Sequence, residues 1–152
     1  MKRLVLYICT MFVGLTAMAC QSKEIKLMQG CDKTFPKSKK LNLEKVTFKT
    51  QYGFTHAADL YVPKNAEGKL PAIAVSGPFG AVKEQCSGLY AQTMAERGFI
   101  TIAFDPSFTG ESSGEPRRTA SPDINTEDFL AAVDYLSMRD DVDAGRIGII
   151  GI

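Results

Sequence analysis

Short apolar runs, separated by polar and glycine-rich segments, recur along most of the chain. Two alternating stretches, Val46–Thr50 and Ala57–Pro63, flank a turn at Tyr52 and Gly53, a pattern that predicts an antiparallel hairpin. Three continuous apolar runs follow at Ala72–Ser76, Phe99–Asp105 and Arg146–Ile150. Runs without polar alternation are typical of strands buried on both faces of a parallel sheet.

Two segments between these runs have helical periodicity. The first extends from about Lys83 to Arg97, and its predicted sheet-facing residues are Cys86, Leu89, Tyr90, Thr93 and Met94. The second is expected to be capped by Asn125 or Thr126, with a core face of Phe129, Leu130, Val133 and Leu136. Strands that alternate with helices indicate right-handed crossovers. The sequence therefore predicts an α/β fold, with an antiparallel hairpin at one edge followed by a parallel β-α-β-α-β unit.

The N-terminus has the features of an export signal. Lys2 and Arg3 precede an apolar stretch that is too short for a comfortable membrane span. The stretch "LTAMAC" resembles the lipobox of bacterial lipoproteins, which implies lipidation of Cys20; ordinary cleavage that leaves Cys20 unmodified is the alternative. We expect residues 1–19 to be a signal peptide, 20–42 a tether and 43–152 the folded domain. Gln21 favours the outer over the inner membrane.

Composition narrows the possible functions. The 152 residues, 45% of them hydrophobic, suffice for one domain, and a net charge of +1 predicts no nucleic-acid partner. A single His and four Cys without zinc-ligand spacing predict no metal or cofactor site. Export would permit a disulfide between Cys31 and Cys86.

The end of the chain carries a family resemblance. "RIGIIGI" resembles the strand before the nucleophile elbow of α/β-hydrolases, G-x-[Ser/Cys]-x-G, with Gly151 as its first glycine. "YGFTHAADLYVP", "VSGPFGAVKEQ" and "AFDPSFTGESSGEP" resemble the entry hairpin, the oxyanion loop and the D-x-x-G-x-G-x-S loop of dienelactone-hydrolase-like and acyl-peptidase-like members. The resemblance covers residues 43–152, the N-terminal half of such a domain.

The resemblance implies a parent lipoprotein that hydrolyses a small ester, lactone, thioester or peptide-like substrate by acyl transfer. Its nucleophile would come directly after Ile152, so this chain holds no member of the triad and is expected to be inactive alone. Phe79 is the first candidate and Gly80 the second for a backbone N–H in the oxyanion hole, since Pro78 has none. A tight Gly-Pro turn without a ligand is the alternative for this loop, and a non-catalytic binding lipoprotein is the alternative function.

Other polar residues receive structural interpretations. We expect His56 to lie on the surface of a strand and Asp105 to hold the following loop through backbone N–H groups. Arg117 and Arg118 are expected to be solvated, and Asp143 to pair with Arg146 across a turn. No base is expected within reach of three serines in the long loop 106–123, Ser107, Ser112 and Ser113.

Overall fold

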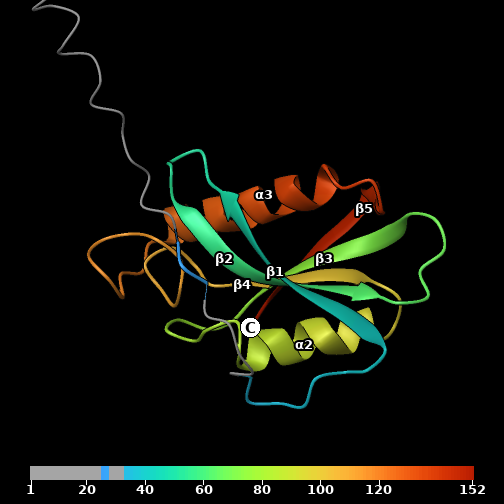
Figure 1. Ribbon diagram of the computed structural model, residues 1–152. Coiled ribbons are helices and arrows are strands. Elements are labelled where there is room, and N and C mark those ends of the chain that lie inside the picture. The colour runs from blue at the N-terminus through green and yellow to red at the C-terminus, as the bar shows by residue number, and fades with distance from the viewer. Residues whose placement is uncertain (1–24, 28–32) are drawn as a thin grey trace, which may run out of the picture.

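A mixed five-stranded sheet lies between two helices in the computed structural model, which describes residues 25–27 and 33–152 (Figure 1). The strands are β1 (Leu41–Lys49), β2 (Thr55–Pro63), β3 (Leu70–Ser76), β4 (Ile100–Phe104) and β5 (Val142–Gly151). The helices are α2 (Cys86–Ala95) and α3 (Pro122–Ser137), which cover opposite faces of the sheet. The predictions for lipidation of Cys20, for the role of Gln21 and for a Cys31–Cys86 disulfide depend on residues outside the described part of the chain.

The strand order β1-β2-β4-β3-β5 confirms the predicted α/β class. β1 and β2 form the antiparallel hairpin at one edge, and β2 joins β4 in antiparallel register. β4, β3 and β5 are parallel, as their continuous apolar runs predict. Four strands, β1, β2, β3 and β5, begin before their predicted starts. The differences are largest for β1, which begins at Leu41 rather than Val46, and for β5, which begins at Val142 rather than Arg146.

The predicted core face of α2 is wrong. Leu89 and Tyr90 are 45% and 47% exposed. The residues that α2 buries against the sheet are mostly small, namely Ser87, Gly88, Ala91, Gln92 and Ala95. Small side chains let the helix lie close to the strands, so in this helix size rather than apolar character marks the buried face.

The start of α3 also differs from the prediction. The helix begins at Pro122, with Ser121 as its N-cap residue, instead of at a cap formed by Asn125 or Thr126. Leu136 is fully buried as predicted, whereas Leu130 is 55% exposed. The remaining buried residues of α3 are Glu127, Asp128, Ala131 and Ala132.

Adjacent positions in α2 give a direct test of its buried face. We expect Gly88→Ala to lower the free energy of unfolding by about 1–3 kcal/mol. A Cβ at this position would lie 2.2 Å from the carbonyl oxygen of Lys83 and 3.1 Å from the hydroxyl of Tyr61. Leu89→Ala, the control, should change it by less than about 0.5 kcal/mol. Urea denaturation of both variants decides: a larger loss for Leu89→Ala would restore the sequence-predicted face.

The segment before β1 packs against α2. Phe35 is 9% exposed, and the side-chain amide of Gln92 binds the segment through Pro36 O and Ser38 N, both at 3.0 Å. The buried ammonium of Lys33 pairs with the buried carboxylate of Asp59 in β2. The described chain from Lys33 onward is therefore part of the packed structure.

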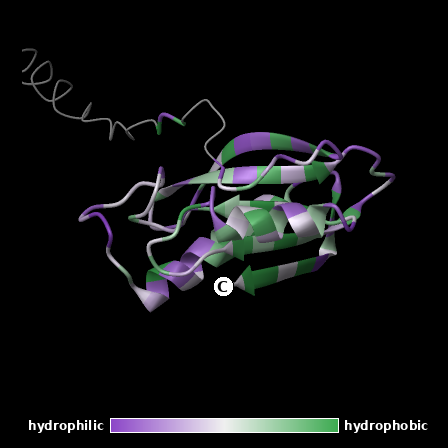
Figure 2. Ribbon diagram, turned by 90° about the horizontal axis from the view of Figure 1, so that it is seen from below, coloured by the Kyte–Doolittle hydropathy of each residue, from purple (hydrophilic) through white to green (hydrophobic). Residues whose placement is uncertain are grey.

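The opposite edge of the sheet is apolar. β5 pairs only with β3 among the described strands, and Ile149 and Ile152 are 60% and 43% exposed. The strand that ends at the C-terminus is green, or hydrophobic, over much of its length (Figure 2).

Neither helix of the described chain is long and apolar enough to cross a membrane.

Candidate active site

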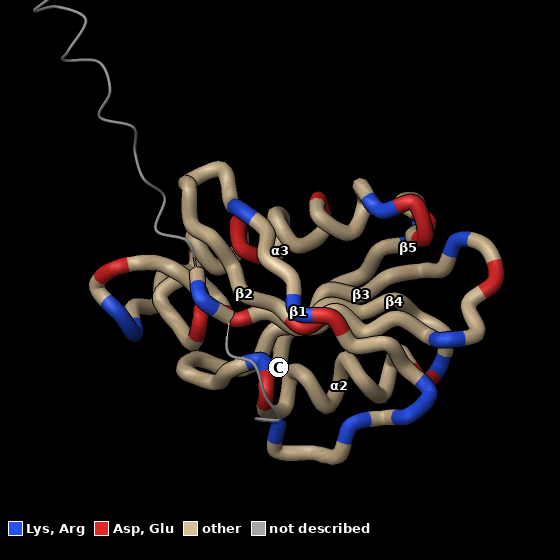
Figure 3. The backbone as a smooth tube through the Cα atoms, in the orientation of Figure 1, with Lys and Arg blue, Asp and Glu red and all other residues tan. Residues whose placement is uncertain are grey.

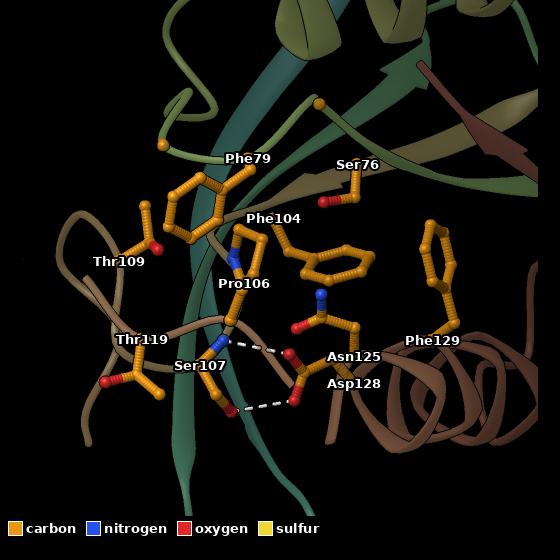
Figure 4. A pocket seen from close by; sticks show the side chains of 13 residues that line it. Ser76, Phe79, Phe104, Pro106, Ser107, Thr109, Thr119, Asn125, Asp128 and Phe129 are labelled. Atoms are coloured by element: carbon orange, nitrogen blue, oxygen red, sulfur yellow. Dashed lines mark hydrogen bonds between the residues drawn. The ribbon is translucent and has the colours of Figure 1, made fainter. Parts of the chain in front are cut away.

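The carboxyl ends of β3 and β4 and the first turns of α3 surround a cavity of about 120 Å³ (Figure 4). Its exposed surface is mostly apolar. The rings of Phe79, Phe104 and Phe129 line it together with polar side chains that include Ser76, Ser107, Asn125 and Asp128. Ligands of open α/β sheets bind at the carboxyl ends of the strands, which is where this cavity lies. No Lys or Arg of the described chain lines it.

Loop 77–85, which follows β3, forms one wall of the cavity. Phe79 and Gly80 both line it, and the Phe79 ring is 68% exposed. Within the described chain, neither residue's backbone N–H donates a hydrogen bond, whereas the N–H of Ala81 donates to Pro78 O at 3.0 Å. Gly80 has a φ of +83°, a conformation that residues with side chains rarely adopt. The N–H groups of these two successive residues are therefore not used within the described chain.

The end of β5 lies beside the start of loop 77–85. The N–H of Ile152 donates to the carbonyl oxygen of Ser76 at 3.2 Å, directly before loop 77–85. Gly151 therefore lies beside the end of β3. A Cβ on Gly77 would lie 3.2 Å from the Cβ of Ala81, which indicates how tightly the start of this loop is packed.

Asp105 directly follows β4 and holds the next loop through hydrogen bonds, as predicted. Its carboxylate accepts the backbone N–H of Glu111 at 2.9 Å and also the backbone N–H and ammonium of Lys83 at 2.7 and 2.9 Å. Burial raises the pKa of Asp105, and the charge of Lys83 and the hydrogen bonds oppose that increase. A Cβ on Gly110 would lie 2.2 Å from this carboxylate, so only glycine leaves room for it.

The prediction for His56 is wrong, because its side chain is fully buried. β2 lies between β1 and β4 in the sheet, so neither edge of this strand is open. The ring stacks on Phe48 with centroids 5.0 Å apart. Its Nδ1 lies 2.8 Å from Asp105 O and its Nε2 lies 3.0 Å from Asp128 Oδ1.

Ser107 also differs from the prediction, since His56 Nε2 lies 3.3 Å from its Oγ. The hydroxyl nevertheless donates to Asp128 Oδ1 at 2.7 Å, and the Ser107 N–H donates to Oδ2 at 2.9 Å (Figure 4). Ser107 lines the cavity but is only 1% exposed, and its hydroxyl proton is donated to Asp128 rather than to His56. This Ser-His-Asp group links β2, the loop after β4 and α3, and it is structural.

The structure also shows where the other polar residues predicted from the sequence lie. Arg117 is exposed, as expected, and its guanidinium also donates to the carbonyl oxygens of Gly110 and Ser112 in its own loop. Arg118 is exposed, as expected. Asp143 pairs with Arg146 at 2.6 Å as predicted, and the guanidinium lowers the pKa of Asp143.

Lys83 of loop 77–85 was not singled out from the sequence, and its side chain is fully buried. A signal was present, because a lysine stands directly between Val82 and Glu84 where the loop leads into α2. The described residues contain no group of three His, Cys, Asp or Glu side chains that could hold a metal ion.

The order of strands, the two flanking helices and the loop after β3 define an α/β hydrolase domain, in part. The α/β hydrolase GrgF from Penicillium sp. sh18 is 27% identical and matches with a TM-score of 0.68 over 74% of this chain and 38% of that chain. Residues 53–152 match the family of X-Pro dipeptidyl-peptidases, S15. The chain belongs to this S15 family, which confirms the resemblance to α/β-hydrolases and places it in a hydrolase class.

Two relatives indicate the range of the family. An uncharacterized protein of Pseudomonas aeruginosa, PA2218, is 66% identical over 130 residues, or 85% of this chain and 35% of that protein. Its crystal structure matches with a TM-score of 0.82 over 84% of this chain and 40% of that chain. The thiohydrolase aneE of Aspergillus aculeatus is 33% identical over 107 residues, or 70% of this chain and 33% of that protein. The chain spans about a third of the length of these relatives.

Proposed function

We propose that the full-length protein hydrolyses a small ester or thioester by acyl transfer. A Ser or Cys directly after Ile152 would be the nucleophile, with an Asp or Glu and then a His following later in the chain. The backbone N–H of Phe79, or else that of Gly80, would bind the oxyanion. The observation that carries the proposal is the pair of unbonded amides in loop 77–85 beside the end of β5.

The cavity and the relatives guide the choice of substrate. A mostly apolar surface without Lys or Arg suits an uncharged acyl group better than a carboxylate-bearing one. A thiohydrolase among the relatives favours a thioester, and the family name adds X-Pro peptides to the substrates worth testing. Lactones remain in the same reaction class. The chemistry needs no cofactor.

The assay uses the full-length gene product with p-nitrophenyl acetate, an acetyl thioester and an Ala-Pro p-nitroanilide. We expect hydrolysis of at least one acyl substrate, and we expect Phe79→Pro, which removes the backbone donor, to lower kcat on the order of 10²–10³-fold. Phe79→Ala keeps the N–H and is the matched control. An unchanged kcat in Phe79→Pro would move the role to Gly80, and no hydrolysis by the wild type would favour the non-catalytic binding function.

We further propose that Cys20 is lipidated and that the protein is exported to the cell envelope, at the outer membrane. The basic start of the chain and the stretch "LTAMAC" support this. A lipid chain adds membrane affinity of about 0.8 kcal/mol per buried CH₂ group. In cells fed an alkyne fatty acid, we expect label on the wild type and none on Cys20→Ser. Label that persists in Cys20→Ser, or wild-type protein in the soluble fraction, would contradict the anchor.

A further inference from the structure

We propose that Lys83 and Asp105 are positioning residues, a buried clamp that holds loop 77–85 in the geometry needed to bind an oxyanion. The inference rests on the proposed function and adds to it a group that would act through the oxyanion loop without touching the substrate. The clamp uses the carboxylate of Asp105, whereas the Ser107 cluster meets the same residue at its backbone carbonyl oxygen, which lies 2.8 Å from His56 Nδ1.

The geometry is that of one carboxylate joining two loops. Asp105 Oδ1 accepts the backbone N–H of Lys83, and Oδ2 accepts both the Lys83 ammonium and the backbone N–H of Glu111. The side chains of Lys83 and Asp105 are both 0% exposed. Two backbone N–H groups, one from loop 77–85 and one from the loop after β4, are thus fixed to the same buried carboxylate.

Further charges complete the clamp. The Lys83 ammonium also lies 2.6 Å from Glu111 Oε2 and 2.7 Å from Glu84 Oε1. Lys45 of β1 lies 3.6 and 3.7 Å from the same two glutamates. In the backbone view, blue and red positions, which mark basic and acidic residues, lie next to the labelled C-terminus (Figure 3). Burial lowers the pKa of Lys83, but the carboxylates outweigh it and hold that pKa above its ordinary value, so the lysine stays charged.

Stability alone does not account for such a clamp. Replacing a buried ion pair by packed apolar side chains is often neutral or stabilising, whereas charged hydrogen bonds fix direction and distance. The loop needs that restraint. Loop 77–85 contains two glycines, Gly77 and Gly80, and the amides of Phe79 and Gly80 have no bond of their own in the described chain. β3 fixes the start of the loop and Lys83 fixes its end, so the two amides lie between two anchors.

The test compares variants of the full-length gene product on the best substrate found above. Lys83→Met keeps the length of the side chain and removes its charge. We expect kcat to fall on the order of 10²-fold with KM nearly unchanged, because misplaced donors weaken transition-state binding rather than substrate binding. The affinity for a boronic acid, which forms a tetrahedral adduct, should fall in parallel.

Two further variants separate positioning from stability. Lys33→Met breaks another buried lysine–carboxylate pair, with Asp59. Thr34 still joins this segment to Glu84 O through its backbone N–H, and the variant should lower Tm and keep kcat within about twofold. The double variant Lys83→Met/Asp105→Leu leaves no unpaired charge in the pair, so it should fold and still have the low kcat.

The outcomes are distinct. A double variant with wild-type kcat, or a kcat loss in Lys33→Met equal to that in Lys83→Met, would overturn the clamp while leaving the proposed hydrolase intact. A wild type that hydrolyses no acyl substrate would contradict the proposed function itself, and the catalytic role of the clamp would fall with it.

Discussion

Asp105→Asn should lower the free energy of unfolding by about 3–5 kcal/mol, the loss expected when one partner of a buried ion pair is removed. The substitution keeps the shape of the side chain, so no cavity contributes. It places an amide N–H₂ where the Lys83 ammonium and the Glu111 N–H both require an acceptor. Lys83 then stays buried with less compensation for its charge.

The measurement is urea denaturation followed by circular dichroism. Asp143→Asn is the matched control, because Asp143 also pairs with a basic side chain, Arg146, but at the surface. Its midpoint should stay close to that of the wild type. Equal midpoints for the two variants would show that the Asp105 pair contributes no more than a surface ion pair.

Leu136→Ala should have the second large effect, a loss of about 2–5 kcal/mol. Leu136 is fully buried in the core between α3 and the sheet, in contact with the cluster that includes Leu60, Ile102 and Val142. Truncation removes apolar contacts and leaves a cavity that surrounding strands cannot close. Leu130→Ala removes the same atoms from a side chain that is 55% exposed and should change stability by less than about 0.5 kcal/mol. A comparable loss at both positions in thermal denaturation would refute the assigned face of α3.

The strands could be predicted from the sequence because their signal is local. Continuous apolar runs mark β3, β4 and β5, and parallel pairing follows from the helices between them. The helix faces were harder, since α2 buries Gly88 and Ala91 and exposes Leu89. Apolar periodicity is the wrong signal for a helix that lies close to its sheet. The start of α3 had a usable local signal that was missed, a serine followed by a proline at the first helical position.

The candidate site was predictable in part for a similar reason. Phe79 and Gly80 follow a buried strand directly, so their position at its carboxyl end comes from the order of elements, and their availability to a ligand comes from the structure. The burial of His56 depends on β4 pairing beside β2, which no local pattern encodes. The Lys83–Asp105 pair joins residues from two loops, and only the parallel pairing of β3 with β4 brings them together.

We propose that this chain provides the backbone N–H groups that bind the oxyanion in an acyl-transfer site. The nucleophile of this site would follow Ile152. Covalent labelling of the full-length protein with a fluorophosphonate, with the adduct located by mass spectrometry, tests it most directly. We predict one fluorophosphonate adduct, on the residue directly after Ile152, where that residue is Ser; where it is Cys, we predict that iodoacetamide abolishes turnover and that its adduct is found on that Cys. An adduct on Ser107, Ser112 or Ser113, or turnover of an acyl substrate without any adduct at the residue after Ile152, would contradict the account.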